Sequence, residues 1–170
     1  MNNTTNNHLE IERKWLVSGW PEIPLPIAEE YTMRQGYICV HPTVRIREEQ
    51  LSGKTPSYIL CFKSAGRLAR REIEIPISKK SFQELEELIS LPLIPKLRRT
   101  YLLPDGLQLE VNHVDPSAET AFWYAEIEFS SVQEAKLWRP DSHLAMYLNH
   151  EVTEKKGFSM GAYWEKTRLL

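Results

Sequence analysis

The chain has 170 residues, of which 42% are hydrophobic and 26% charged, values that are ordinary for one folded domain with an adequate core. Its 21 basic and 23 acidic residues leave a formal net charge of −2, which disfavours a general nucleic-acid binder, since such proteins show a clear basic excess. No apolar run reaches the roughly 20 residues that span a bilayer. We therefore expect neither a nucleic acid nor a membrane as partner.

The N-terminus and the cysteines indicate where the protein resides. Residues 1–8 are rich in Asn and Thr and lack the basic region and apolar core of a secretory signal, so we expect a short disordered tail before a single domain at 9–170. Two cysteines, Cys39 and Cys61, cannot form a disulfide framework, and each stands among apolar residues. We expect two buried thiols in a reduced, cytoplasmic protein.

Hydrophobic alternation with period two dominates the chain from residue 9 to residue 129. Turn-forming pairs such as Ser52-Gly53 and Ala65-Gly66 separate several of the alternating segments. The expected strands are residues 9–17, 31–40, 43–49, 57–64, 70–77, 96–103, 107–113 and 124–129. They predict a mainly β (α+β) fold, an eight-stranded antiparallel closed β-barrel with a few short helices packed outside it.

Three segments show helical signals instead. A Ser-Phe-Gln-Glu capping box opens residues 81–89, where apolar residues recur at helical spacing, and a second capping box opens residues 131–138. Residues 159–168 form the third candidate helix. We expect Trp15 to pack beneath such a helix on the outer face of the barrel. The same apolar layer is expected to include Trp123, Trp138 and Trp164.

Charged residues fall on one face of strand after strand, because residues two apart in a strand share a face. The sets are Glu10 and Glu12 with Lys14, Arg45 and Arg47, Glu72 and Glu74, Lys96 and Arg98, and Glu126 and Glu128, with Lys63 and Glu110 on further strands. For a single strand the ordinary explanation is a face exposed to solvent. Like charges on one face repel, so stability does not account for the whole set, whereas a bound ligand would. A closed barrel directs both signs of charge into one lumen.

The residue types indicate the ligand. Arg binds phosphate oxygens through paired N–H donors, and Lys binds them as a mobile point charge. Carboxylates grouped without His or Cys form oxygen sites suited to Mg²⁺ or Mn²⁺. A lumen that carries both kinds of group fits a metal-complexed polyphosphate.

Glu10-Ile11-Glu12-Arg13-Lys14 resembles the N-terminal Glu-x-Glu-x-Lys signature of the CYTH superfamily, the triphosphate tunnel metalloenzymes. Further motifs follow in that family's order over nearly the whole chain. They are Arg34-Gln35-Gly36-Tyr37, Val44-Arg45-Ile46-Arg47, Lys63, Glu72-Ile73-Glu74, Lys96-Leu97-Arg98, Glu110, Ala125-Glu126-Ile127-Glu128 and Glu151-Val152-Thr153. The resemblance is closest to the small bacterial tripolyphosphatase-like branch. It implies a tunnel of antiparallel strands, dependence on a divalent cation, and hydrolysis or cyclisation of a triphosphate.

With this resemblance the charged residues take expected roles. The expected ligands of Mg²⁺ or Mn²⁺ are Glu10, Glu12, Glu74, Glu110, Glu126 and Glu128. The expected triphosphate-binding residues are Lys14, Arg45, Arg47, Lys63, Lys96 and Arg98. The expected catalytic residues are Lys14, Glu72 and Glu74. Lys14 would lie nearest the metal-bound phosphate, and Glu72 or Glu74 would orient the attacking water or complete a second metal site.

The leading expectation is metal-dependent hydrolysis of inorganic tripolyphosphate to pyrophosphate and phosphate. Hydrolysis of thiamine triphosphate or of a nucleoside triphosphate would use the same lumen, but it needs a pocket for the organic group at one mouth. A class IV adenylyl cyclase must also position a ribose hydroxyl. A polyphosphate-binding module without turnover is the alternative from another class, although anion binding alone needs no acidic pairs. Monomer and homodimer both remain open.

Two positions depart from the family's pattern. The family usually has Asp where Asn112 stands, and many members carry a basic residue near Gly157. Asn112 removes one carboxylate, so we expect weaker metal binding or water activation, which an Asn112→Asp exchange would strengthen. We expect either that Lys155 or Lys156 supplies the basic charge near Gly157 or that the end of the triphosphate is held less tightly.

Overall fold

The computed structural model describes residues 9–170, so the tail expected at 1–8 lies outside the described residues. The strands are β1 (Leu9–Val17), β2 (Ile27–Cys39), β3 (Thr43–Leu51), β4 (Ser57–Lys63), β5 (Ala69–Pro76), β6 (Ile94–Leu102), β7 (Gln108–Val114), β8 (Phe122–Glu128) and β9 (His150–Glu151). The helices are α1 (Lys79–Ile89), α2 (Val132–Leu137), α3 (Ser142–Tyr147) and α4 (Met160–Arg168). No helix in this part of the chain is long and apolar enough to cross a bilayer.

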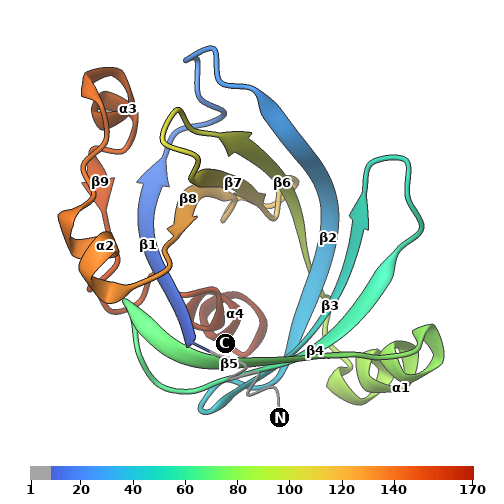
Figure 1. Ribbon diagram of the computed structural model, residues 1–170. Coiled ribbons are helices and arrows are strands. Elements are labelled where there is room, and N and C mark those ends of the chain that lie inside the picture. Colours follow the sequence, from blue (N-terminus) through green and yellow to red (C-terminus); the bar gives the residue numbers. More distant parts are fainter. Residues whose placement is uncertain (1–8) are drawn as a thin grey trace, which may run out of the picture.

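Strands β1 to β8 form a closed antiparallel barrel in the order β5-β4-β3-β2-β6-β7-β8-β1 (Figure 1). β1 closes the barrel, because Leu9 pairs with Arg71 of β5 while Lys14 pairs with Glu126 of β8. The short strand β9 pairs with the later part of β1, beyond the residues that pair with β5. The predicted eight-stranded barrel is confirmed.

Several elements differ in extent from the sequence-based expectation. β2 begins at Ile27 rather than at residue 31. Residues 27–30 pair with β6, although their sequence does not alternate between apolar and polar residues. α1 is capped by Ser78, whose side chain accepts the N–H of Ser81, so the helix begins before the expected capping box. α3 and β9 have no counterpart among the expected elements. Asp141 caps α3 by accepting two backbone N–H bonds, which is a signal that the sequence does carry.

A large apolar layer lies between the outer face of the barrel and helices α2 and α3. Its buried members include Trp15 and Ile127 from the strands and Ala135 from α2. Trp15 packs beneath a helix, as predicted, and its ring meets that of Trp138 edge-on at 5.9 Å. Because alternate side chains of β1, β7 and β8 are buried in this layer, the intervening ones point into the lumen.

Arg13 shares the outer face of β1 with Trp15 and ties this layer together. Its Nε and NH2 donate to the two carboxylate oxygens of Glu151 in β9 at 2.8 and 2.6 Å. Its NH1 donates to the carbonyl oxygens of Ala135 and Trp138 at 3.1 and 3.0 Å. The guanidinium carbon also lies 5.0 Å from the ring centroid of Trp15. Arg13 therefore holds α2 and β9 against the barrel and takes no part in the lumen.

α4 covers one end of the barrel and is seen through the ring of strands in Figure 1. Trp164 of α4 packs there against Tyr37, with ring centroids 5.7 Å apart, in a cluster that also contains Tyr124. Trp164 thus lies in a different cluster from the outer layer expected for it, because α4 closes an end of the barrel instead of covering its side. Gly161 permits the close approach, since a Cβ there would stand 2.9 Å from Cγ1 of Val40.

Candidate active site

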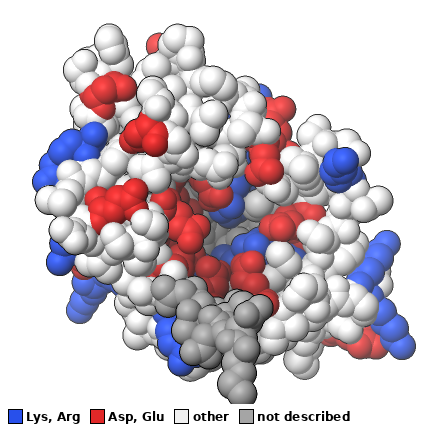
Figure 2. Space-filling view, in the orientation of Figure 1, with Lys and Arg blue, Asp and Glu red and all other residues white. Residues whose placement is uncertain are grey.

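The barrel encloses a cavity of about 1660 Å³ that is lined by side chains from every one of its strands. Figure 2 shows its hollow, around which acidic and basic side chains gather. Each residue with a predicted site role lines this cavity. They are Glu10, Glu12, Lys14, Arg45, Arg47, Lys63, Glu72, Glu74, Lys96, Arg98, Glu110, Glu126 and Glu128. The alternation of charge along the strands thus brings together residues that are far apart in the sequence.

Glu10, Glu12, Glu126 and Glu128, from the neighbouring strands β1 and β8, form the carboxylate group of the lumen. Glu12 lies directly opposite Glu128 in the strand register. Burial, together with the charges of Glu126 and Glu10, raises the pKa of Glu12 to about 7. Burial and the neighbouring carboxylates also raise the pKa of Glu128. The carboxylate group is therefore crowded with negative charge.

The donor chemistry of the carboxylate group fits a hard divalent cation. All four members offer oxygen, and neither His nor Cys stands among them, which suits Mg²⁺ or Mn²⁺ better than a softer metal. Lys63 and Arg70 lower the pKa of Glu12, but they do not offset burial and the charges of Glu126 and Glu10. A bound divalent ion would relieve that repulsion.

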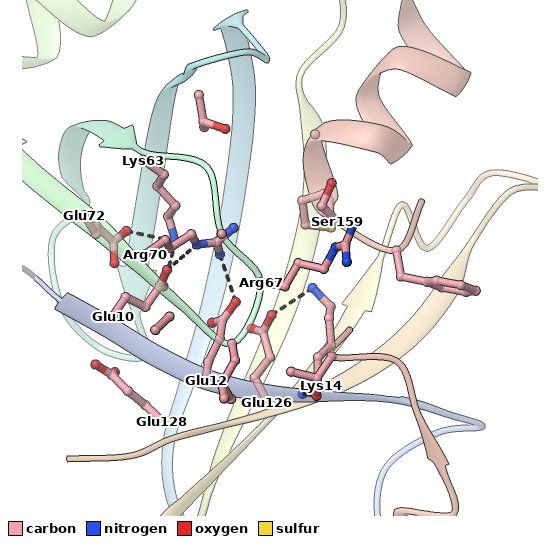
Figure 3. A pocket seen from close by; sticks show the side chains of 18 of the residues that line it. Glu10, Glu12, Lys14, Lys63, Arg67, Arg70, Glu72, Glu126, Glu128 and Ser159 are labelled. Atoms are coloured by element: carbon pink, nitrogen blue, oxygen red, sulfur yellow. Dashed lines mark hydrogen bonds and ion pairs between the residues drawn. The ribbon is translucent and has the colours of Figure 1, made fainter. Parts of the chain in front are cut away.

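Two lysines reach into the carboxylate group (Figure 3). Nζ of Lys63 lies 2.7 Å from Oε1 of Glu10 and 3.0 Å from Oε1 of Glu72. Nζ of Lys14 lies 2.8 Å from Oε1 of Glu126. Burial opposes ionisation of Glu126, but Lys14, Arg98 and Lys96 together more than offset it, so that the pKa of this carboxyl falls below its usual value.

Arg70 of β5 is a lumen residue for which no role was predicted. Its Nε donates to Oε2 of Glu10 at 2.6 Å, and its NH2 donates to Oε1 of Glu12 at 2.8 Å (Figure 3). Arg70 lies two positions before Glu72 and therefore on the same strand face. Alternation alone was thus a sufficient signal for placing it in the lumen.

Arg45 and Arg47 of β3 and Lys96 and Arg98 of β6 form the basic group, and β2 lies between these two strands in the barrel order. Arg45 is 7% exposed, and among the described residues its Nε and NH2 have no hydrogen-bond partner. Leaving a buried donor without a partner costs free energy, and a ligand with several anionic oxygens would remove that cost.

Lys96 is the most deeply buried member of the basic group, with 2% of the residue exposed. Its Nζ lies 3.3 Å from the hydroxyl oxygen of Tyr124. Burial and the charge of Arg98 lower the pKa of Lys96 well below its ordinary value, and Arg45 and Arg47 add to the effect. Positive charge is crowded on this wall as negative charge is on the other.

Two of the predicted metal ligands pair with the basic group. NH2 of Arg47 lies 3.0 Å from Oε1 of Glu74, and NH1 of Arg98 lies 2.7 Å from Oε2 of Glu110. Glu110 also stands opposite Glu126 in the register, at the border between the two groups. Glu74 and Glu110 are thus engaged by arginines of the basic group, whereas Glu10 and Glu12 are engaged by Arg70.

Cys61 of β4 is fully buried, as predicted, but its surroundings are charged rather than apolar. Its Sγ donates to Oε1 of Glu72 at 3.1 Å, and burial raises the pKa of the thiol to about 11. The thiol is therefore protonated at neutral pH. Cys61, Glu72 and Glu74 place donor atoms within 4.8 Å of one another, but a protonated thiol is a poor ligand for a divalent cation. Cys39 is half-buried, contrary to the prediction, because β2 ends at this residue.

No family model matches the chain. The chain is 33% identical over 153 residues to an inorganic triphosphatase from Nitrosomonas europaea, an alignment that covers 88% of this chain and 92% of the relative. The chain belongs to the triphosphate tunnel metalloenzymes. The crystal structure of the inorganic triphosphatase NE1496 is similar to this tunnel metalloenzyme with a TM-score of 0.57 and 28% identity, covering 91% of this chain and 93% of that one. The PH1819 protein from Pyrococcus horikoshii has the same fold, with a TM-score of 0.55, 18% identity, and 75% and 82% of the two chains covered.

In this triphosphate tunnel metalloenzyme Asn112 contacts the basic group. The residue is fully buried, and its Oδ1 accepts a hydrogen bond from Nε of Arg98 at 3.0 Å. Its Nδ2 has no hydrogen-bond partner among the described residues. Asn112, which stands where the family usually has Asp, therefore removes a negative charge next to Arg98 and leaves the carboxylate group unchanged.

The other departure lies at the mouth of the tunnel. Gly157 has a φ of 86°, a conformation that favours glycine over a basic side chain. Lys155 and Lys156 line the cavity next to it. Arg67, from the loop between β4 and β5, also lines the mouth and donates from NH1 to the carbonyl oxygen of Glu154 at 3.1 Å. Basic charge is thus present at this mouth without a side chain at Gly157.

Proposed function

We propose that this triphosphate tunnel metalloenzyme hydrolyses inorganic tripolyphosphate to pyrophosphate and phosphate. One observation carries the proposal: a single cavity holds crowded carboxylates on one wall, from β1 and β8, and crowded basic side chains on another, from β3 and β6. A metal-complexed polyphosphate is the ligand that satisfies both walls at once. The relative at 33% identity, which is an inorganic triphosphatase, supports the same substrate.

The basic group would hold the phosphate chain. Arg45 and Arg47 reach into the cavity from β3, and Lys96 and Arg98 reach into it from β6, so that contacts are spread along an extended anion. Phosphoryl transfer passes through a loose transition state whose charge lies on the phosphoryl oxygens, and fixed cations stabilise that charge. Spread contacts also favour three phosphates over two.

The carboxylate group would hold the divalent cation, which we propose to be Mg²⁺ or Mn²⁺. When bound, the cation would neutralise phosphate oxygens that the basic group does not contact. Glu110, which stands opposite Glu126, is placed to join these ligands. Arg47 would exchange its partner Glu74 for phosphate oxygens, and Glu74 would then be free to bind the cation or a water.

Lys14, Glu72 and Glu74 are the residues to which we assign the reaction itself. Nζ of Lys14 lies 3.9 Å from the ring centroid of Tyr124 and pairs with Glu126, so it would contact the phosphoryl group next to the cation. Glu72 accepts hydrogen bonds from the chain's own donors, which fix the orientation of its carboxylate. Glu72, with Glu74 two positions along the strand, would orient the attacking water.

α4 favours an inorganic substrate over an organic one. An adenosine or thiamine group needs space beyond the phosphate chain, at a mouth of the tunnel. At one end that space is taken by α4, whose Trp164 packs against Tyr37. The chain of three phosphates needs no such extension.

The proposal is tested by measuring phosphate release from tripolyphosphate, pyrophosphate, ATP and thiamine triphosphate, each with Mg²⁺, Mn²⁺ or excess chelator. We expect tripolyphosphate to be cleaved fastest, pyrophosphate at least about tenfold more slowly, and nothing to be cleaved in chelator. Turnover that persists in chelator would remove the metal from the mechanism. Cyclic AMP formed from ATP would indicate a cyclase, and binding without phosphate release would indicate a binding module.

We also propose that the enzyme works in the reduced cytoplasm, because a buried, protonated Cys61 needs no oxidising compartment. Cell fractionation tests this location. Size-exclusion chromatography with light scattering distinguishes the monomer from the homodimer.

A further inference from the structure

Arg70 holds the two carboxylates at the start of β1 in one fork. Its Nε lies 2.6 Å from Oε2 of Glu10, and its NH2 lies 2.8 Å from Oε1 of Glu12. The other oxygen of Glu10 accepts from Nζ of Lys63 at 2.7 Å. Both oxygens of Glu10 and one oxygen of Glu12 are therefore already engaged by the protein's own cations.

A guanidinium and a divalent cation compete for these oxygens. Charge-assisted hydrogen bonds of this length are among the strongest in proteins, and a metal ligand must direct a lone pair at the ion instead. Glu10 and Glu12, two of the carboxylates to which we assign the metal, thus cannot bind it fully while they are bonded to Arg70.

Arg70 would lose all its carboxylate partners to a bound metal, whereas Lys63 would keep one. Lys63 also pairs with Glu72 at 3.0 Å, so it keeps a partner if Glu10 turns away. Within residues 9–170, Arg70 pairs with Glu10 and Glu12 and with no further carboxylate. Displacing Arg70 without replacing its partners would leave a guanidinium in a largely buried lumen with nothing to neutralise it, which is costly.

We propose that Arg70 is a placeholder cation that couples metal binding to triphosphate binding. In the metal-free lumen it occupies Glu10 and Glu12, and it leaves them when the metal enters. Phosphate oxygens of the triphosphate then replace the lost carboxylate partners, because Arg70 lines the same cavity. The metal alone therefore binds weakly, whereas the metal and the triphosphate together bind well. This inference rests on the proposed metal site and adds a positioning residue to it.

The test is a calorimetric titration of Mn²⁺ alone into the metal-free protein. Arg70→Gln removes the competing charge and should bind Mn²⁺ at least about tenfold more tightly than the wild type. Arg70→Lys keeps the charge but cannot form the fork, and should lie between the two. Arg71→Gln is the matched control, because Arg71 is an exposed neighbour on the outer face of the same strand, and should leave the affinity unchanged.

A second titration uses the preformed Mn²⁺ complex of imidotriphosphate, which is not hydrolysed. In the wild type the affinity for this complex should exceed the affinity for Mn²⁺ alone. The ratio of the two affinities should be at least about tenfold smaller in Arg70→Gln, because the residue that couples the two binding events is absent. Equal or weaker Mn²⁺ binding by a folded Arg70→Gln protein would overturn the placeholder role. If Arg70→Gln does not fold, the Arg70→Lys variant takes its place: tighter Mn²⁺ binding than in the wild type supports the placeholder role, and equal or weaker binding overturns it.

Glu12→Gln separates this inference from the proposed function. Loss of Mn²⁺ binding in Glu12→Gln, with no gain in Arg70→Gln, would leave the metal site standing and reject the placeholder alone. Mn²⁺ binding that is the same in the wild type, Glu12→Gln and Arg70→Gln would reject the metal site and the placeholder together.

Discussion

Nζ of Lys96 lies 3.3 Å from the hydroxyl oxygen of Tyr124, inside the basic wall of the tunnel. Burial and the charge of Arg98 lower the pKa of this lysine well below its ordinary value. In the unfolded chain the ordinary value returns, so the folded protein binds fewer protons between the two pKa values. The cost of Lys96 to stability is therefore full below the lowered pKa and disappears as the pH rises towards 10.5.

The same shift predicts that triphosphate binding takes up a proton. A polyanion next to Lys96 favours the charged amine and raises its pKa again, so protons enter from the solvent at a pH between the two values. Calorimetry of tripolyphosphate binding in excess chelator, in two buffers of different ionisation enthalpy, measures this uptake. The difference in binding enthalpy between the two buffers should be much smaller in the Lys96→Met variant. Identical heats in both buffers for the wild-type protein would show that Lys96 is already charged before the anion arrives.

Exchange of Arg45 or Arg47 for Ala should impair the enzyme without unfolding it. Both side chains line the lumen, and Nε and NH2 of Arg45 have no hydrogen-bond partner among the described residues. Arg47 pairs with Glu49 and Glu74, but both of these carboxylates are partly exposed, so solvent can take the place of the arginine. We expect kcat/KM for tripolyphosphate to fall by roughly 10²–10³. Circular dichroism should show an unchanged melting profile. A collapsed melting temperature in both variants would assign these residues to the structure instead.

Glu12→Gln should stabilise the metal-free protein while destroying metal binding. The pKa of Glu12 is raised from 4.5 to about 7, so its ionised form opposes folding fully above pH 7 and ceases to do so as the pH falls towards 4.5. In chelator at pH 8 the variant should be more stable by roughly 1–3 kcal/mol, and the difference should vanish near pH 4. Urea unfolding at both pH values checks this. A variant that is less stable at pH 8 would mean that Glu12 is already neutralised.

Asn112→Asp should weaken triphosphate binding. Oδ1 of Asn112 accepts from Nε of Arg98, whose NH1 already pairs with Glu110 at 2.7 Å. An added carboxylate would neutralise Arg98 further, and KM for tripolyphosphate should rise about tenfold. Mn²⁺ affinity in the absence of substrate should stay close to that of the wild type. Tighter Mn²⁺ binding would support the expectation from sequence, that this position acts on the metal.

Arg13→Met should lower stability and leave the lumen unaffected. The guanidinium bonds to Glu151 and to the carbonyl oxygens of Ala135 and Trp138, and it stacks on Trp15. The side chain of Glu151 is 39% exposed, so solvent screens that pair, and most of the loss of about 1–3 kcal/mol should come from the two carbonyl groups and the ring. Urea unfolding measures the loss, while KM and kcat of the folded fraction should not change.

The sequence was sufficient to place the charged residues in one lumen, because period-two alternation fixes the face of a side chain without reference to other strands. It was not sufficient to assign them to walls. That depends on β2 pairing with β6 and on β1 pairing with both β5 and β8, which are contacts between distant segments. The engagement of Glu74 by Arg47 could not be foreseen for this reason. Trp164 was misplaced because a helix across a barrel end has the same local pattern as one along its side.

The pairing of β1 also sets the order in which the protein can mature during synthesis. Lys14 and Glu126 meet across a separation of 112 residues, and Lys63 reaches Glu10 across 53. β1 leaves the ribosome before β2 to β8 and therefore waits for β8 before the barrel can close, while the hairpins from β2 to β5 can form earlier from local contacts. Until then no complete lumen exists. A nascent chain should thus acquire its binding capacity in one late step, and ribosome stalling before β8 should yield a chain with secondary structure but no affinity for metal or phosphate.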